Sequence, residues 1–245
     1  MKVQYEQRGH FHCAPVPPGP CLAVLMPCFN ESRTVGEIAH RVLAQEVVGQ
    51  LVIVDDGSTD GTWEHLQVLS KDVRVQILKH PGNMGKGAAI RTALTMARQP
   101  LVVIQDADLE YDPTDLKRLV EPVRSGQAVA VYGSRFFRKG SAQTTTWHAL
   151  LNRLLTWVTN AVTGQCLTDE ATCYKLLPRE LMSDLNMQEK GFGFCPEVTA
   201  KLSRRGIAVV EVPVDYRARS RAEGKKLRLR DGFIAIYCLL KYSFF

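Results

Sequence analysis

A chain of 245 residues, with 45% hydrophobic and 23% charged residues, has the composition of a soluble globular protein that can bury a substantial core. It has no apolar run of the roughly 18 residues that a membrane-spanning helix needs, and its first residues lack the apolar segment of a secretory signal. The net charge of +6 is local, because seven basic residues and one acidic residue lie between Arg217 and Arg230, which indicates an anionic partner near that segment.

The cysteines and the first twenty residues each lead to a further expectation. The seven cysteines are odd in number and show no C-x-x-C pair or zinc-like spacing, so we expect reduced thiols in a cytosolic protein. Residues 1–20 end in the proline-rich stretch APVPPGP, and we expect them to form an irregular arm rather than a packed element.

From residue 21 onward, short apolar runs rich in Val, Ile and Leu alternate with segments of helical periodicity. Such runs suit strands buried on both faces of a parallel sheet, and they cover residues 21–26, 51–56, 75–78, 101–108 and 128–134. Between them, apolar stripes predict helices that contain residues 35–43, 63–69, 88–97 and 116–123. Asp112 and Pro113 form a good N-cap and first residue for the last helix. The alternation predicts an α/β fold with a doubly wound sheet.

The second part of the chain has a different pattern. It predicts a broad amphipathic helix over residues 147–161, helices over 178–185 and 196–205, a strand within 207–216, and a closing amphipathic helix over 231–245. No linker or internal repeat separates the two parts. We therefore expect a single domain over residues 21–245, with a ligand-binding half at about 21–135 and a helical extension at about 136–245.

Polar motifs follow three of the predicted strands: PCFNES (27–32), VDDGSTDGT (54–62) and QDADLE (105–110). Open parallel sheets bind ligands beyond the carboxyl ends of their strands, so these motifs together indicate a nucleotide pocket. Alone, DDGSTDGT is equally explained as a tight turn. In extended backbone, Asp106, Asp108 and Glu110 would share one face and repel each other, so we expect a positive group among them.

These motifs, together with NMGKGAA (83–89), GSRF (133–136), TDEATCYK (168–175), FGFCPEVTAK (192–201) and the basic segment at 216–232, form an ordered series. The series resembles the family 2 glycosyltransferases of GT-A fold over nearly the whole chain after residue 20. Its second half resembles the bacterial branch near dolichyl-phosphate mannose synthases. The resemblance implies a mostly parallel sheet and an inverting, metal-dependent hexosyltransferase. Such an enzyme moves a sugar from a nucleotide diphosphate to a polyprenyl phosphate, whose phosphate attacks the anomeric carbon.

The resemblance also assigns residues to the donor side. It implies that Asp108 and Glu110 hold Mg²⁺ or Mn²⁺, although a glutamine stands at the position of Glu110 in lipid-phosphate mannose synthases. A divalent ion there would neutralise the charge of the leaving group. The base, the ribose and the phosphates would be bound by Pro27, Phe29, Glu31, Asp55, Asp56, Lys86 and Asp106. For NMGKGAAIR two explanations are open: phosphate binding by helix N–H groups with Lys86 and Arg91, or a glycine-rich helix start with an exposed lysine.

On the acceptor side, the resemblance assigns Arg135, Arg219, Lys225 and Lys226 to the acceptor phosphate. The guanidinium groups of the two arginines can bind phosphate in bidentate fashion. Asp169 is either a general base or a group that orients these arginines, and a phosphate acceptor needs no base. The role of Glu197 stays open. His148 is expected at an interface or in the core rather than as a ligand.

Partners follow from the same features. We expect a nucleotide-diphosphate sugar, a polyprenyl phosphate, and contact with the cytoplasmic membrane face through the helix at residues 147–162, the basic segment and the C-terminal helix. The same apolar stripes also suit a core or a homo-oligomer interface. No motif predicts nucleic-acid binding. Two alternatives remain: an enzyme that glycosylates a soluble hydroxyl, and a non-catalytic nucleotide-sugar binder.

Overall fold

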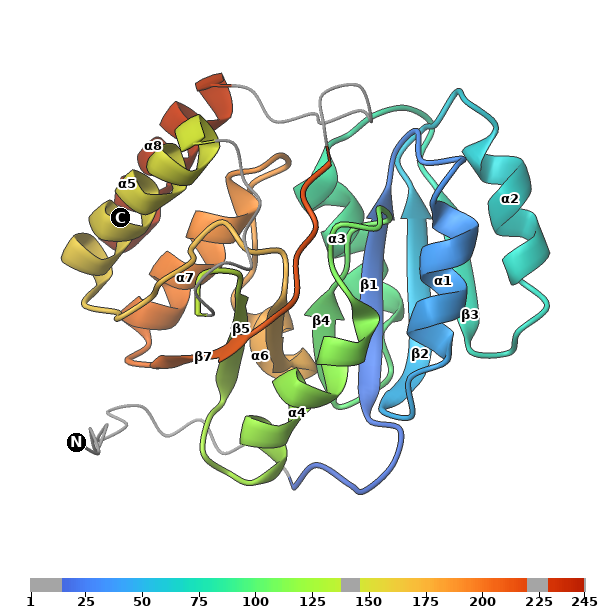
Figure 1. The fold of residues 1–245 in the computed structure, drawn as a ribbon, viewed down its shortest axis with the longest axis horizontal. Helices are drawn as coiled ribbons and strands as arrows, with labels where there is room; N and C mark the ends of the chain where they lie inside the picture. Colours follow the sequence, from blue (N-terminus) through green and yellow to red (C-terminus); the bar gives the residue numbers. More distant parts are fainter. Residues whose placement is uncertain (1–14, 138–145, 220–228, 245) are drawn as a thin grey trace.

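A computed structural model describes residues 15–137, 146–219 and 229–244 of the chain. Its centre is a seven-stranded sheet in the order β3-β2-β1-β4-β6-β5-β7 (Figure 1). Neighbouring strands are parallel, except that β6 is antiparallel to both β4 and β5. The strands are β1 (Leu22–Cys28), β2 (Val48–Asp55), β3 (Val75–Lys79), β4 (Leu101–Ile104), β5 (Ala130–Ser134), β6 (Lys175–Pro178) and β7 (Val209–Pro213).

Helices cover both faces of this sheet. Apolar side chains of α1, α2 and α4 pack on one face, and those of α3, α6 and α7 pack on the other. The remaining two helices, α5 and α8, lie outside α7 and pack against it and against each other (Figure 1). The helices are α1 (Val35–Leu43), α2 (Thr62–Leu69), α3 (Lys86–Met96), α4 (Leu116–Arg124), α5 (Thr146–Thr163), α6 (Arg179–Asp184), α7 (Phe194–Arg204) and α8 (Leu229–Phe244), with a 3-10 turn η1 (Pro113–Asp115) before α4.

Strand β1 shows why the apolar runs form a sheet that is buried on both sides. Leu22, Val24 and Met26 belong to the core on the α1 side, whereas Ala23 and Leu25 belong to the core on the α3 side. Successive side chains of a strand point to opposite faces, so a continuous apolar run is stable only between two layers of helices. The composition of the run therefore determines the three-layer architecture.

The strand register determines where the polar motifs meet. Cys28 of β1 pairs with Asp55 of β2, and Leu25 pairs with Ile104 of β4, so the loops after these three strands emerge at one edge. Strand β6 runs in the opposite direction, which brings the residues before it to the same edge. There they lie next to Ser134, the last residue of β5.

Several sequence predictions need correction. The strand predicted over 101–108 ends at Ile104. Strand β6 was not predicted, because its four residues adjoin the apolar stripe of the next helix, and the predicted helix over 178–185 begins one residue later. The apolar stripe predicted within residues 63–69 included Val68, but this side chain is 62% exposed. The five strands expected in the first half, the helices around them and the N-cap role of Asp112 are confirmed.

Three further features bear on the expectations from composition. The six described cysteines are all free thiols. No helix in the described part of the chain has both the length and the apolar character needed to cross a bilayer. Residues 15–20 contain no helix or strand, although Val16 packs against the core on the α1 side.

Gly133, in the motif GSRF, generates a stability prediction. A Cβ atom there would lie 2.6 Å from Val214 Cγ1 and 2.9 Å from Tyr174 Cβ, so Gly133→Ala should lower the free energy of unfolding by about 1–3 kcal/mol through overpacking. Gly36→Ala is the matched control, because nothing lies within 4 Å of its Cβ position and α1 should gain about 0.5–1 kcal/mol. Urea denaturation measures both, and equal midpoints for the two variants would contradict the close packing.

Candidate active site

The loops after β1 and β2 are joined by hydrogen bonds. The backbone N–H of Asn30 donates to Ser58 Oγ at 2.9 Å, and that of Glu31 donates to Thr62 Oγ1 at 2.9 Å. Asn30 has a left-handed backbone conformation, with φ of 52°, which asparagine adopts more readily than most residues. The motif DDGSTDGT therefore acts as a turn, and this turn fixes Glu31 beside the end of β2.

Asp55 and Asp56 are both buried at the end of β2, but they have different surroundings. Asp56 accepts hydrogen bonds from the backbone N–H groups of Met84 at 2.9 Å and Gly85 at 2.8 Å, and its Oδ1 lies 2.7 Å from Nδ1 of His80. It fastens the loop before α3. Asp55 accepts one backbone N–H through Oδ1, whereas its buried Oδ2 has no partner among the described residues. An unpartnered buried oxygen is unfavourable, so Asp55 offers an acceptor to a ligand.

The three acidic residues after β4 do not share one face, because the strand ends before them and the chain turns at Asp108. Asp108 Oδ1 accepts the backbone N–H of Glu110 at 3.0 Å. Asp106 points elsewhere, and its Oδ1 lies 2.5 Å from Lys86 Nζ. The predicted common face is therefore wrong. The expected positive charge is present as two cations: Lys86 beside Asp106, and Arg219 beside Asp108 and Glu110.

Arg219 lies at the centre of a carboxylate cluster. Its Nη2 donates to Asp108 Oδ2 at 2.6 Å, its Nη1 donates to the two oxygens of Glu31 at 3.0 and 3.2 Å, and its backbone N–H donates to Glu110 Oε1 at 2.7 Å. Burial and the negative charge of Asp106 raise the pKa of Asp108 to about 7, although Arg219 acts in the opposite direction. The cluster thus depends on a neighbouring cation for its charge balance.

The glycine-rich start of α3 is explained by a loop that packs closely on it. A Cβ on Gly85 would lie 2.4 Å from the carbonyl oxygen of Lys190, and one on Gly87 would lie 2.3 Å from that of Glu189. Arg91 Nη1 donates to the same Glu189 oxygen at 2.6 Å. Of the two explanations for this motif, the glycines and Arg91 therefore support the packing one. Lys86 is nevertheless not exposed, because it pairs with Asp106.

Glu197, whose role the sequence leaves open, holds that loop in place. Its buried carboxylate accepts the backbone N–H groups of Gln188 at 2.7 Å and Glu189 at 2.8 Å, and an ammonium hydrogen of Lys201 at 2.6 Å. The side chain of Glu189 accepts the hydroxyl of Tyr242, in α8, at 2.8 Å. Glu197 is thus a support that joins α7 and α8 to the start of α3, where Lys86 begins the helix.

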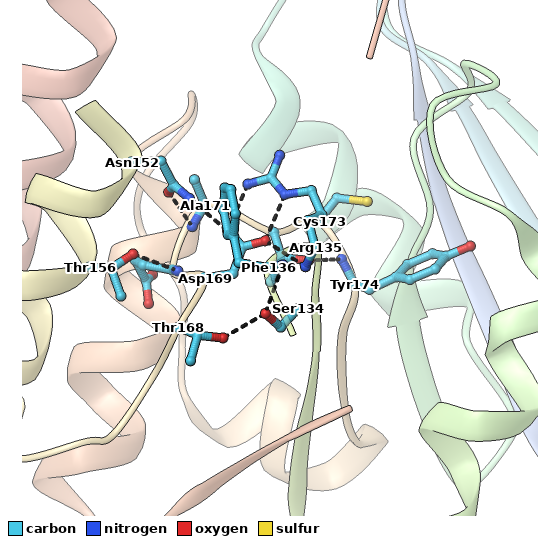
Figure 2. A network of polar contacts seen from close by, with 12 residues as sticks. Ser134, Arg135, Phe136, Asn152, Thr156, Thr168, Asp169, Ala171, Cys173 and Tyr174 are labelled. Atoms are coloured by element: carbon cyan, nitrogen blue, oxygen red, sulfur yellow. Dashed lines mark hydrogen bonds and ion pairs between the residues drawn. The ribbon is translucent and has the colours of Figure 1, made fainter. Parts of the chain in front are cut away.

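A second cluster surrounds Arg135, just after β5 (Figure 2). The Nε and Nη2 atoms of Arg135 donate to the two oxygens of Asp169 at 2.6 and 2.7 Å, and Asn152 Nδ2 donates to Asp169 Oδ1 at 2.9 Å. Burial alone would raise the pKa of Asp169, but the Arg135 guanidinium outweighs burial and lowers it. A carboxylate with both oxygens engaged and a lowered pKa is a poor base. The geometry therefore favours the orienting role for Asp169.

Further buried side chains fix the loop that carries Asp169. Lys175 Nζ donates to the carbonyl oxygen of Glu170 at 2.9 Å and lies 3.7 Å from the ring centroid of Tyr132. Thr199 Oγ1 lies 3.0 Å from Glu170 Oε2, and burial raises the pKa of Glu170 to about 7 despite Lys175. The buried pair of Lys175 and Glu170 was not predicted from the sequence. Its only signal was a lysine at the start of an apolar run, which more often marks a solvent-facing position.

Tyrosines connect the two clusters. The guanidinium carbon of Arg135 lies 4.9 Å from the ring centroid of Tyr216, and the Tyr216 ring lies 5.0 Å from that of Tyr111. Tyr111 and Tyr216 also form an isolated antiparallel bridge. Arg219 follows Tyr216 by three residues. One short segment therefore contacts Arg135 in the second cluster through Tyr216, and the carboxylates of the first cluster through Arg219. The two clusters are therefore parts of one site.

A cleft of about 960 Å³ opens beside Arg219. Glu31, Glu110 and Arg219 belong both to its wall and to the carboxylate cluster. The other described lining residues are Asn30, Ser32, Arg33, Thr34, Glu37, Arg41, Asp60, Leu109, Tyr111, Asp112, Asp215, Tyr216, Arg217 and Ala218. The wall therefore carries charges of both signs.

The remaining predicted residues are less informative. Pro27 and Phe29, at the end of β1 and just after it, are half-buried. Lys225 and Lys226 lie outside the described residues, and so does the side chain of His148. Nothing in the structure tests the roles assigned to them.

The cluster around Arg219 can be compared with the needs of a divalent ion. Among the described residues, no three Asp, Glu, His or Cys side chains are arranged to hold an ion as they stand. Asp108, Glu110 and Glu31 nevertheless supply the carboxylate oxygens that Mg²⁺ and Mn²⁺ prefer, and all three lie against one cation. The residues therefore fit a divalent ion in chemistry and position, on condition that the guanidinium leaves.

Comparison with known proteins identifies the family. The model of the family "Glycosyl transferase family 2" matches residues 23–185, which is 163 of the 245 residues. The chain belongs to glycosyltransferase family 2. Its mostly parallel α/β sheet is the GT-A fold of its structural neighbours.

Curated relatives include proteins named for lipid-phosphate substrates. The chain is 29% identical to the glycosyltransferase AglJ of Haloferax volcanii, over 91% of this chain and 72% of that protein. It is 28% identical to the polyprenol monophosphomannose synthase of Mycolicibacterium smegmatis, over 91% and 89%. It is 26% identical to the dolichol-phosphate mannosyltransferase of Pyrococcus furiosus, over 83% of this chain but only 58% of that protein.

Solved structures agree on the fold. The glucosyl-3-phosphoglycerate synthase of Mycobacterium tuberculosis in complex with uridine diphosphate has a TM-score of 0.70 at 22% identity, covering 91% of this chain and 80% of that one. The same enzyme was also crystallised with Mn²⁺, uridine diphosphate and its product, and that structure has a TM-score of 0.67. A divalent metal and a nucleotide are therefore found together on this fold.

The support provided by Glu197 can be measured. Glu197→Gln should lower the free energy of unfolding by about 2–3 kcal/mol, because it replaces one of the two buried acceptor oxygens by an NH2 group, which leaves one backbone N–H without an acceptor and Lys201 without a charged partner. Glu180→Gln is the matched control, since that side chain is 77% exposed and should change stability by less than about 0.5 kcal/mol. Urea denaturation with equal losses in both variants would show that Glu197 is not a support.

Proposed function

We propose that this family 2 glycosyltransferase is an inverting, metal-dependent enzyme that moves a hexose from a nucleotide-diphosphate sugar to a polyprenyl phosphate. The observation that carries the proposal is the convergence of Glu31, Asp108 and Glu110 on one cation at the carboxyl edge of the sheet. Carboxylates gathered at this edge are suited to a metal-bound diphosphate.

On the donor side, Asp55 is the best-supported ligand. Its unpartnered Oδ2 can accept a hydrogen bond from a base N–H, and its burial strengthens that bond. Phe29 and Pro27, at the end of β1, supply apolar surface for the base. Asp56 is engaged in holding the loop before α3, which supports a positioning role for it. We assign Asp106, which lies against Lys86, to the ribose, as the resemblance implies.

The charge of the leaving group determines what the next residues do. A divalent ion bound by Asp108 and Glu110 would act as a Lewis acid toward the departing diphosphate. Lys86 lies beside Asp106 at the same edge, and its ammonium group can approach a phosphate oxygen. Both groups act where negative charge increases during the reaction, which is where stabilisation accelerates transfer.

On the acceptor side, Arg135 is the candidate for the acceptor phosphate. Asp169 fixes the plane of its guanidinium through two hydrogen bonds, and Asn152 fixes Asp169. A pre-oriented guanidinium binds phosphate with less loss of entropy than a mobile one. A phosphate monoester is already anionic near neutral pH, so the reaction needs no general base, and the engagement of Asp169 is consistent with that.

An exposed apolar stripe supports a lipid acceptor. On α5, Leu150, Leu154 and Trp157 share one face, and Trp157 is 68% exposed. On the neighbouring α8, the exposed residues Phe233, Tyr237, Leu240 and Phe244 follow helical spacing. We assign this stripe to the surface of the cytoplasmic membrane, where amphipathic helices bury their apolar face in the headgroup region. The inner face of α5 carries Asn152, so the same helix would face the bilayer and fix the acceptor arginine.

A second candidate acceptor is a small soluble molecule with a hydroxyl group. The 960 Å³ cleft beside Arg219 favours it, because its wall includes Arg33, Arg41 and Arg217. An anionic sugar or acid would match those guanidinium groups.

Asp108 provides the test of the donor chemistry. Asp108→Asn should lower kcat/KM for metal-dependent transfer by about a thousandfold, because the amide cannot supply a negative metal ligand. Glu121→Gln, on the exposed face of α4, controls for the charge change and should leave transfer unchanged. A donor-transfer assay with Mn²⁺ gives the result, with circular dichroism as a check on folding. Unchanged rates in Asp108→Asn would contradict the metal role, and donor binding without any transfer by the native protein would favour the non-catalytic alternative.

The acceptor is tested by competition between substrates. Purified protein is given the donor with polyprenyl phosphate in phosphatidylglycerol vesicles, or with soluble sugars and hydroxy acids. We expect product with the lipid, and we expect Trp157→Ser to reduce vesicle binding by about tenfold through loss of buried apolar area. Val73→Ser is the control, because Val73 is 98% exposed near β3, away from the stripe. Product with soluble acceptors alone would favour the second candidate.

A further inference from the structure

Residues 214–219, here called the strap, run from the end of β7 into the carboxylate cluster. The backbone N–H of Val214 donates to the Ser134 carbonyl at 3.1 Å, and that of Arg217 donates to the Glu110 carbonyl at 2.8 Å. Between them, Tyr216 forms the bridge with Tyr111. The strap is thus attached to the sheet at one end and to the loop after β4 at the other.

Arg219 is the last residue of the strap, and its guanidinium lies in the carboxylate cluster. It contacts carboxylates from two separate loops: Glu31 after β1, and Asp108 and Glu110 after β4. Its side chain is only 17% exposed, and its buried Nε has no hydrogen-bond partner among the described residues. Arg219 therefore fills the centre of the cluster rather than lying on its surface.

We infer that Arg219 is an internal competitor of the metal ion, so that occupation of the carboxylate cluster by a divalent cation and by Arg219 exclude each other. This inference rests on the proposed function for the existence of the metal. It adds that the protein's own strap sets how tightly the metal is bound.

The exclusion follows from distance and charge. Metal–oxygen bonds of about 2.0–2.2 Å require the carboxylates to close around the ion, whereas the guanidinium holds Asp108 and Glu31 at hydrogen-bond distances of 2.6 and 3.0 Å. Two cations also repel each other at such separations in a buried site. Metal binding must therefore displace the Arg219 guanidinium from the carboxylate cluster. The hydrogen bond from the backbone N–H of Arg219 to Glu110 Oε1 must also break if Glu110 is to become a metal ligand.

Linkage makes this competition reciprocal. If metal binding weakens the contact between the strap and the carboxylates, then that contact weakens metal binding by the same factor. In the empty enzyme Arg219 keeps three like charges together and so preserves the site. Once displaced, its guanidinium becomes available to a phosphate group, the role that the resemblance implies for it.

The test measures Mn²⁺ binding without donor or acceptor, by titration calorimetry and by the electron paramagnetic resonance signal of free Mn²⁺. Arg219→Ala should bind Mn²⁺ at least about tenfold more tightly than the native protein, because the fraction of sites open to metal increases. Arg217→Ala is the matched control. It removes the same charge from the same strap, and the contact that the structure gives Arg217 is through its backbone N–H. It should bind Mn²⁺ like the native protein.

A second measurement needs no variant. Hydrogen exchange of the peptide spanning 214–219 should accelerate severalfold in the native protein when Mn²⁺ is added, because the backbone N–H of Arg219 loses Glu110 Oε1 as its acceptor. Equal Mn²⁺ affinity in native protein and Arg219→Ala, with unchanged exchange, would overturn the competition and leave the proposed function intact. Equal tightening in both variants would reduce it to a general charge effect and also overturn it. Absence of Mn²⁺ binding in all three proteins would overturn both the competition and the metal role.

Discussion

Negative charge gathered at one edge of a buried sheet has to be balanced, and this requirement organises the site. Carboxylates here are paired with cations from other segments of the chain, Asp106 with Lys86, Asp108 with Arg219 and Asp169 with Arg135, and within one loop Glu170 is paired with Lys175. Removing one partner from such a pair leaves an uncompensated buried charge, which is far more destabilising than the pair itself is stabilising. The pairs therefore specify which segments meet at the edge.

The fold could largely be predicted from sequence, because its determinants are local. Apolar runs such as 51–54 are typical of strands between two layers of helices, and the apolar stripe of α4 faces the core. The prediction failed where a local signal was short or ambiguous. Strand β6 has four residues and ends in Pro178, the residue before α6, so its two leucines adjoin the predicted helix over 178–185 and were assigned to no strand. Its antiparallel direction depends on strand register, which no local pattern reports.

The structure brings Asp55, Asp106 and Asp108 to one edge of the sheet, as predicted, but not in the predicted arrangement. The sequence placed Asp106 and Asp108 at a strand end correctly, yet the prediction of one shared face assumed extended backbone, and the turn at Asp108 sends the two side chains to different cations. Likewise, the motif NMGKGAA has the composition of a phosphate loop. Its glycines are required by the backbone of a loop about a hundred residues later, at Glu189 and Lys190. Contacts over such separations leave no periodic signal in the sequence.

Strand β6 also restricts how the enzyme can move. Its hydrogen bonds to β4 and β5 insert a piece of the second half of the chain into the middle of the sheet that begins in the first half. The two halves of the chain cannot open about a hinge, as the domains of many two-domain enzymes do, without breaking the hydrogen bonds of β6 to β4 and β5. Substrate entry and product exit must therefore rely on rearrangement of loops at the rim, while the sheet keeps a fixed geometry through the whole catalytic cycle.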